Sequence, residues 1–162
     1  TWRWNGVPFY LRSGKRMPKK TTEIVIYFRP TPHGLFNSGP STPNQIVINV
    51  QPDEGIRLRF EGKVPGIGMN IKSVLMDFDY ATQFHAEPPE AYATLLLDAM
   101  RGDQTLFKQR EEIEHAWRVV QPVLDYWQEQ RGEAIPTYPA GSWGPADADE
   151  MLGKHGSHWH IS

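Results

Sequence analysis

Apolar and polar residues alternate along much of the first half of the chain. Residues 23–28, 45–50, 55–61 and 74–80 all show a period of two, which is typical of strands. In the third of these runs Ile56, Leu58 and Phe60 share one face, while Arg57 and Arg59 lie on the other. The pattern predicts an antiparallel sheet with one dry and one wet face, with its strands lying between about residues 6 and 80.

Turn-forming residues separate these runs. The sequence Gln-Pro-Asp-Glu-Gly at 51–55 predicts a hairpin, and residues 30–43 are rich in Pro, Gly, Ser and Asn, which predicts a long loop. The residues after Thr1 are strand-like rather than leader-like. We therefore expect the chain to start inside a longer protein.

The second half changes to helical spacing between about residues 88 and 131. Pro88 and Pro89 favour a helix start, an apolar stripe follows over residues 91–100, and Gly102 favours its end. A second helical pattern covers residues 110–130, with Pro122 expected to kink or divide it. We expect residues 132–162 to be irregular. Strands followed by helices predict one α+β domain, an antiparallel sheet with helices packed on one face.

Composition narrows the function classes. The net charge is −2, which gives no overall electrostatic footprint for nucleic acid or a membrane surface. The chain has no cysteine, which excludes disulfides and thiolate chemistry and suits a reducing compartment, so we expect a cytoplasmic protein. No apolar run approaches the length of a membrane span.

The first twenty residues are strongly basic. No acid occurs before Glu23, and the cations are Arg3, Arg12, Lys15, Arg16, Lys19 and Lys20. Such a cluster in an otherwise acidic chain indicates an anion site, because lysine is a good phosphate ligand. A solvated sheet edge guarded by lysines explains the cluster equally well. The composition leaves both interpretations open.

Two motifs resemble cofactor or metal sites but do not match them. Gly66-Ile-Gly68 lacks the third glycine of a dinucleotide loop, where Ile71 stands, so a turn is the simpler interpretation. The histidines at 155, 158 and 160 could bind a metal, but a flexible terminus explains them better. We therefore expect no cofactor-binding residue and no metal in this chain.

Four ordered blocks together resemble the glucose-6-phosphate dehydrogenase family. The first is WNGVPF at 4–9 with LRSGK at 11–15, and the second is NQIVI at 44–48 with VQP at 50–52. The third combines residues 90–98, GDQTLF at 102–107 and EHAW at 114–117; the fourth is YPAGS at 138–142 with GP at 144–145. The resemblance runs from residue 2 to about residue 153.

This resemblance implies that residues 1–162 are part of the family's C-terminal α+β domain, without the N-terminal Rossmann domain. The family oxidises glucose 6-phosphate to 6-phosphogluconolactone with NADP or NAD, in the oxidative pentose phosphate pathway of carbohydrate metabolism. A histidine base and most of the NADP contacts would lie outside this chain, so no catalytic residue is expected here. The family's sheet forms dimers, which implies a homodimer or a dimer of dimers.

By residue-for-residue resemblance, Lys15 and Lys20 line the sugar-phosphate site. Gln51 and Arg12 match family positions with a weaker or less certain link to substrate. Two other hypotheses stay open at this point. One is a non-catalytic dimerisation module derived from the same family. The other is a nucleic-acid binder that uses the basic N-terminal edge, against which the acidic remainder and scattered tryptophans argue.

Overall fold

The computed structural model describes residues 2–30, 43–85, 90–130 and 135–161. The expected loop at 30–43 falls almost wholly outside these ranges, as does the expected helix start at Pro88 and Pro89. The chain divides into two compact units. One contains residues 1–80 and 136–162, and the other contains residues 81–135.

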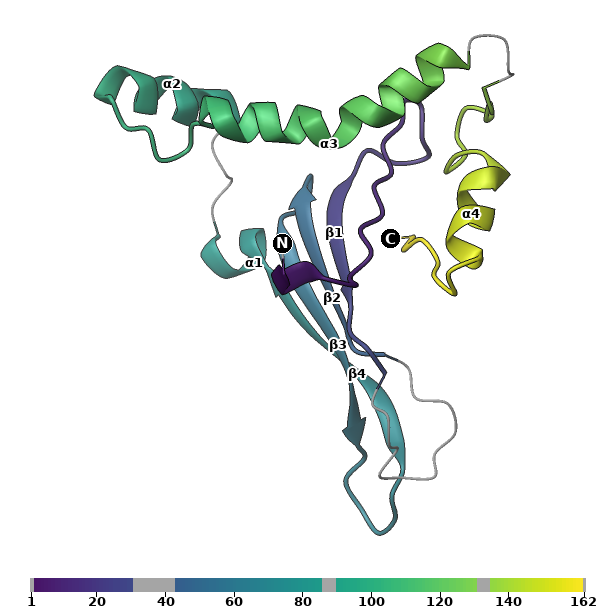
Figure 1. Ribbon diagram of the computed structural model, residues 1–162. Coiled ribbons are helices and arrows are strands. Elements are labelled where there is room, and N and C mark those ends of the chain that lie inside the picture. The colour runs from purple at the N-terminus through teal and green to yellow at the C-terminus, as the bar shows by residue number, and fades with distance from the viewer. Residues whose placement is uncertain (1, 31–42, 86–89, 131–134, 162) are drawn as a thin grey trace. The chain divides into compact units, whose positions relative to one another are not determined.

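A four-stranded antiparallel sheet organises the first unit (Figure 1). Its strands are β1 (Thr22–Tyr27), β2 (Gln45–Gln51), β3 (Gly55–Lys63) and β4 (Ile71–Asp79), hydrogen-bonded in the order of the sequence. The short link between β2 and β3 confirms the expected hairpin. Residues 65–68 form bends between β3 and β4, as the interpretation of the Gly-Ile-Gly motif as a turn predicts.

The predicted start of the strands near residue 6 is wrong. A 3₁₀ turn, η1 (Trp2–Trp4), opens the described chain, and no strand precedes Thr22 in the described residues. Pro8 and Pro18 each remove an amide donor that a strand ladder needs. Gly6 adopts a positive φ of 76°, which breaks an extended run.

The two faces of the sheet do not follow the predicted dry and wet assignment. The even-numbered face is apolar but open, with Ile24 53%, Ile26 43% and Met76 58% exposed. The odd-numbered face instead contains the buried side chains of β2, since Gln45 is 4% and Val47 6% exposed. The reason is tertiary: the end of the chain packs against this face.

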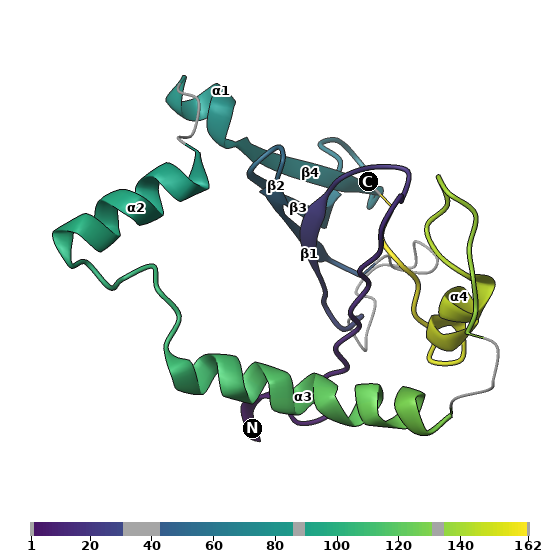
Figure 2. The ribbon, with the colours of Figure 1, turned by 90° about the horizontal axis from the view of Figure 1, so that it is seen from above.

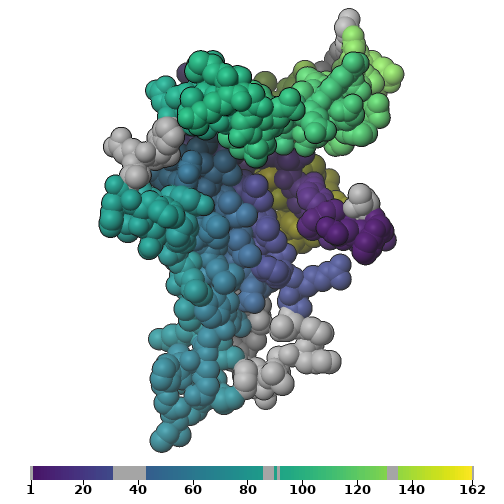
Figure 3. All heavy atoms as spheres, turned by 90° about the vertical axis from the view of Figure 1, so that its left-hand side faces the viewer, coloured from purple at the N-terminus to yellow at the C-terminus, as the bar shows by residue number. Residues whose placement is uncertain are grey.

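The expectation that residues 132–162 are irregular is also wrong in part. Helix α4 (Ala146–Gly153) forms there and buries Leu152, which is 2% exposed. Alanine, glutamate, methionine and leucine are good helix formers, and Asp147 and Asp149 complement the dipole in the first turn. Residues 154–161 then run back beside the N-terminal residues (Figure 2), and the space-filling view shows C-terminal atoms next to the purple N-terminal ones (Figure 3).

Helices α1 (Tyr80–Phe84), α2 (Ala91–Arg101) and α3 (Arg110–Glu129) follow the sheet in sequence. Gly102 ends α2 in the left-handed conformation, as predicted. Gln109 and Glu112 form a capping box at the start of α3. Pro122 does not divide α3, although the ribbon changes direction about midway along it (Figure 1).

The elements together confirm the α+β class. The packing of helices on one face of the sheet stays a prediction, because α2 and α3 belong to the second unit. In the described parts of the chain, no helix is both long and apolar enough to cross a bilayer.

Candidate functional site

Lys15 lies in a turn that spans residues 13–17, which we call the Lys15 turn. Arg16 has a φ of 56°, in the left-handed region that residues other than glycine rarely adopt. Such a backbone needs outside support. The side chain of Lys15 is exposed, and no carboxylate is paired with it among the described residues.

The support comes from the C-terminal part of the same unit. The amide of Lys15 donates to the hydroxyl of Tyr138 at 3.2 Å, and that hydroxyl donates to the carbonyl of Lys15 at 2.9 Å. The amide of Gly141 donates to the carbonyl of Arg16 at 2.8 Å. Residues 138–141 therefore hold the Lys15 turn from more than 120 residues away in the sequence.

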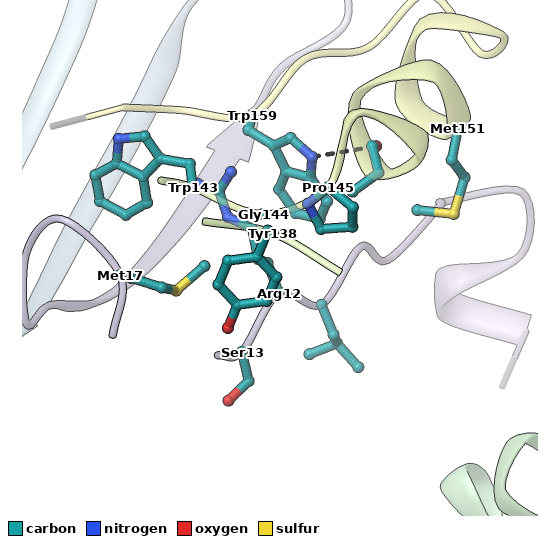
Figure 4. A pocket seen from close by; sticks show the side chains of 11 residues that line it. Arg12, Ser13, Met17, Tyr138, Trp143, Gly144, Pro145, Met151 and Trp159 are labelled. Carbon is teal, nitrogen blue, oxygen red and sulfur yellow. Dashed lines mark hydrogen bonds between the residues drawn. The ribbon is translucent and has the colours of Figure 1, made fainter. Parts of the chain in front are cut away.

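Arg12 also contacts residues near the C-terminal end of this chain. Its guanidinium carbon is 5.0 Å from the ring centroid of Trp143 and 4.6 Å from that of Trp159. Figure 4 shows the guanidinium between the two indoles, and its Nη2 donates to the carbonyl of His160 at 3.3 Å. Stacking on two rings is a geometry that lysine cannot reproduce. The structure thus gives Arg12 partners within the chain, and its predicted substrate contact stays a prediction.

A small cavity of about 200 Å³ opens beside Arg12. Its lining is largely apolar and aromatic, with contributions from Leu11, Met17, Tyr138, Trp143, Pro145, Met151 and Trp159. The indole nitrogen of Trp159 donates to the carbonyl of Ala148 at 3.3 Å, which fixes one wall (Figure 4). This contact joins α4 to the end of the chain.

The histidine-rich segment that we expect to be a flexible terminus is instead packed on the sheet. Nδ1 of His160 lies 3.1 Å from Oε1 of Glu23, and the ring of His158 lies 5.4 Å from that of Tyr27. Burial raises the pKa of Tyr27; Arg59 partly opposes this, and Glu23 adds to it. Among the described residues, no group of three or more histidines and carboxylates is placed to hold a metal.

Lys20 and Gln51 lie near the end of the β1–β2 pair where β1 begins and β2 ends. Gln51 pairs with Thr22 in the register of β1 and β2, and its Nε2 donates to Oγ1 of Thr22 at 3.4 Å. Lys20 is exposed and precedes that pair by two residues. In the described chain, no hydrogen bond or ion pair joins the side chains of Arg12, Lys15, Lys20 and Gln51 to one another.

Sequence reasoning missed the residues that build this region from the C-terminal side: Tyr138, Trp143, Trp159 and His160. The tryptophans are scattered along the sequence, and nothing in their spacing points to Arg12. The one available signal was the block YPAGS at 138–142, which resembles a family block but has no periodicity.

Comparison with known proteins gives a consistent match. The family model for the C-terminal domain of glucose-6-phosphate dehydrogenase covers residues 1–160. The glucose-6-phosphate 1-dehydrogenase of Aggregatibacter actinomycetemcomitans is 49% identical over 158 residues, which are 98% of this chain but 31% of that relative. This chain therefore spans about a third of the length of the curated relatives that it matches.

Solved structures agree with this match. The glucose-6-phosphate 1-dehydrogenase of Mycobacterium avium is 38% identical, with a TM-score of 0.78 over 100% of this chain and 33% of its own. A glucose-6-phosphate dehydrogenase in complex with its substrate glucose 6-phosphate is 31% identical, with a TM-score of 0.77 over 91% of this chain and 30% of its own.

Proposed function

Because the chain belongs to the glucose-6-phosphate dehydrogenase family and matches its C-terminal domain, we propose that it is part of an NADP-dependent oxidoreductase. The full enzyme oxidises glucose 6-phosphate to 6-phosphogluconolactone in the oxidative pentose phosphate pathway. NADP would accept the hydride from C1 of the sugar, and a histidine outside this chain would accept the hydroxyl proton. We place the enzyme in the cytoplasm, since a reducing compartment suits a chain without cysteine.

In this proposal Lys15 and Lys20 hold the sugar phosphate, with Gln51 and Arg12 as weaker candidates. The observation that supports it best is the Lys15 turn, whose main chain is held while its cationic side chain stays exposed. A lysine without a carboxylate partner is available to a phosphate, and a charge-assisted contact of this kind is among the stronger hydrogen bonds. A substrate complex of a 31% identical relative also fits a sugar phosphate as ligand.

The described residues do not supply a dinucleotide loop. Gly66 and Gly68 lie between two antiparallel strands, and β4 rather than a helix follows them at Ile71. A phosphate-binding loop requires a helix N-terminus at that point. We therefore assign NADP to the part of the relatives that this chain does not match, and we assign no metal.

The direct test is an activity comparison. The full-length protein that contains this chain is incubated with glucose 6-phosphate and NADP, and reduced cofactor is followed by absorbance. We expect turnover from the full-length protein and none from residues 1–162 alone. Absence of turnover by the full-length protein would refute the proposed activity, and turnover by the isolated chain would refute the assignment of base and cofactor to missing parts.

The second candidate function is a non-catalytic dimerisation module of the same family. It is favoured by the open apolar face of the sheet, where Ile24 is 53% and Met76 58% exposed, more than a solvated face usually presents. Sedimentation equilibrium of the full-length protein distinguishes the two. Self-association without turnover would favour the module. Turnover together with a homodimer or dimer of dimers would favour the enzyme with the proposed partners.

A further inference from the structure

One hydroxyl satisfies both main-chain polar groups of a single residue. Tyr138 accepts from the amide of Lys15 at 3.2 Å and donates to its carbonyl at 2.9 Å. Each backbone residue has only these two polar groups, so the phenol replaces the partners that a strand or helix would otherwise provide. This fixes the plane of the peptide on either side of the Lys15 Cα.

The direction of a side chain follows from the backbone that bears it. A lysine side chain has many rotamers, so its ammonium samples a wide volume unless its base is fixed. Fixing the Cα–Cβ direction reduces the volume that the ammonium must search before it meets an anion. A held turn therefore makes Lys15 a better ligand than the same lysine on a loose loop.

Gly14 has a matching role beside this contact. A Cβ built on Gly14 would lie 2.7 Å from the hydroxyl of Tyr138 and 3.2 Å from Sδ of Met17. A separation of 2.7 Å is shorter than a carbon–oxygen contact tolerates, so any larger residue would displace the hydroxyl. The turn thus has glycine where the phenol approaches, and its need for glycine arises from space rather than from φ.

We propose that Tyr138 is a positioning residue for the substrate site: its hydroxyl fixes the main chain of Lys15 so that the ammonium faces the sugar phosphate. This inference rests on the proposed function of Lys15. Tyr138 itself touches no substrate in the proposal. It acts only through Lys15. This role differs from that of a residue that stabilises the fold in general.

The test uses Tyr138→Phe in the full-length protein, because this change removes the hydroxyl and keeps the ring. We expect the KM for glucose 6-phosphate to rise about three- to tenfold, the range for losing one or two neutral hydrogen bonds. The KM for NADP should not change, since the cofactor is assigned elsewhere. Tyr92→Phe is the matched control, because Tyr92 is 79% exposed in α2 and makes no described hydrogen bond through its hydroxyl.

A double-mutant cycle with Lys15→Ala separates positioning from stability. If Tyr138 acts through Lys15, then Tyr138→Phe should add less than about a twofold change in KM once the lysine side chain is gone. An effect of equal size in both backgrounds would overturn the proposal, and so would an unchanged KM in Tyr138→Phe alone. An unchanged KM in Lys15→Ala would instead refute the proposed role of Lys15.

Gly14→Ala provides a second, independent probe of the same contact. In the protein that keeps Tyr138, the new Cβ should displace the hydroxyl and raise the KM for glucose 6-phosphate. In the Tyr138→Phe protein the oxygen is absent, so the same substitution should have a smaller effect. Equal effects in the two proteins, or no effect in the first, would overturn the proposal even if Tyr138→Phe proved unstable.

Discussion

Nδ1 of His160 lies 3.1 Å from Oε1 of Glu23, although the two residues are 137 positions apart in the chain. The pair is largely enclosed, with 24% of the His160 side chain and 14% of the Glu23 side chain exposed. It attaches residues 155–161 to β1 and covers the odd-numbered face of the sheet.

This contact predicts that His160→Ala loosens the C-terminal segment. The substitution leaves the Glu23 carboxylate largely buried with neither oxygen paired, since its Oε2 already lacks a partner in the described chain. Losing the partner of a buried polar group costs about 1–3 kcal/mol, so amide exchange in peptides covering 155–161 should accelerate by roughly fivefold or more. Hydrogen exchange read by mass spectrometry measures this.

His115→Ala is the control, because His115 is exposed on α3 and its side chain makes no hydrogen bond, ion pair or ring contact in the described chain. Equal exchange in peptides 155–161 of the His160→Ala and His115→Ala proteins would contradict a role for the pair. A suppressor offers a further check. Glu23→Gln should reduce the cost of His160→Ala, because a neutral amide is less expensive to leave unpaired than a carboxylate.

Replacing Lys15 or Lys20 with alanine in the full-length protein should raise the KM for glucose 6-phosphate. A charge-assisted contact to a sugar phosphate is worth about 1.5–3 kcal/mol, or roughly ten- to a hundredfold in affinity. The KM for NADP should not change. Steady-state kinetics with each substrate varied separately gives both constants, and kcat falls as well if the phosphate contact aligns C1 with the hydride acceptor.

Lys19→Ala is the matched control for these kinetics, because it removes an exposed cation next to Lys20 to which the proposed function assigns no role. A general electrostatic attraction predicts similar changes for all three lysines, together with a strong dependence on salt. A specific contact predicts a large change for Lys15 and Lys20 only. An unchanged KM for glucose 6-phosphate in both Lys15→Ala and Lys20→Ala would contradict the phosphate site and favour the interpretation of the basic segment as a solvated sheet edge.

Thr105→Val should raise the pKa of Asp103 towards its ordinary value. The hydroxyl and the amide of Thr105 both donate to Oδ1 of Asp103, at 2.6 Å and 2.9 Å, and these bonds lower the pKa of that carboxyl. Because the folded pKa lies below the unfolded one, their stabilising effect is present above about pH 4. It is lost as the pH falls through the lower, folded value.

Carbon-13 NMR titration of the Asp103 carboxyl provides the measurement for this prediction. In the Thr105→Val protein the amide still donates, so the pKa should remain below its ordinary value. Thr94→Val, in the first turn of α2, is the control and should leave the titration of Asp103 unchanged. An identical titration in the wild-type and Thr105→Val proteins would show that the hydroxyl does not contribute.

The sequence predicted those parts of the fold that depend on neighbours in the chain. The strands from Thr22 onwards follow from alternation, the β2–β3 hairpin from its turn residues, and the end of α2 from Gly102. The expectation of an irregular segment failed at α4, because the short run 146–153 lies among prolines and glycines that dominate the local pattern.

Of the candidate site, the sequence predicts the lysines but not the residues that hold them. The lysines were found because charge clusters are visible in a sequence and because their block resembles a family. Tyr138 makes its contacts across 123 residues, and no periodicity connects it with Lys15. The reversal of the buried face has the same origin, since His158 and His160 cover the odd-numbered side by tertiary contact.

The hydrogen bond between Arg12 and the carbonyl of His160 spans 148 residues. Closing so long a loop is entropically costly and slow compared with forming a hairpin. During synthesis the strand pairs β2–β3 and β3–β4 can therefore form first, while the Lys15 turn waits for residues 138–160 to leave the ribosome. The basic segment is thus fixed only after residues 138–160 have been made, so products truncated before residue 138 would have the sheet without an ordered Lys15 turn.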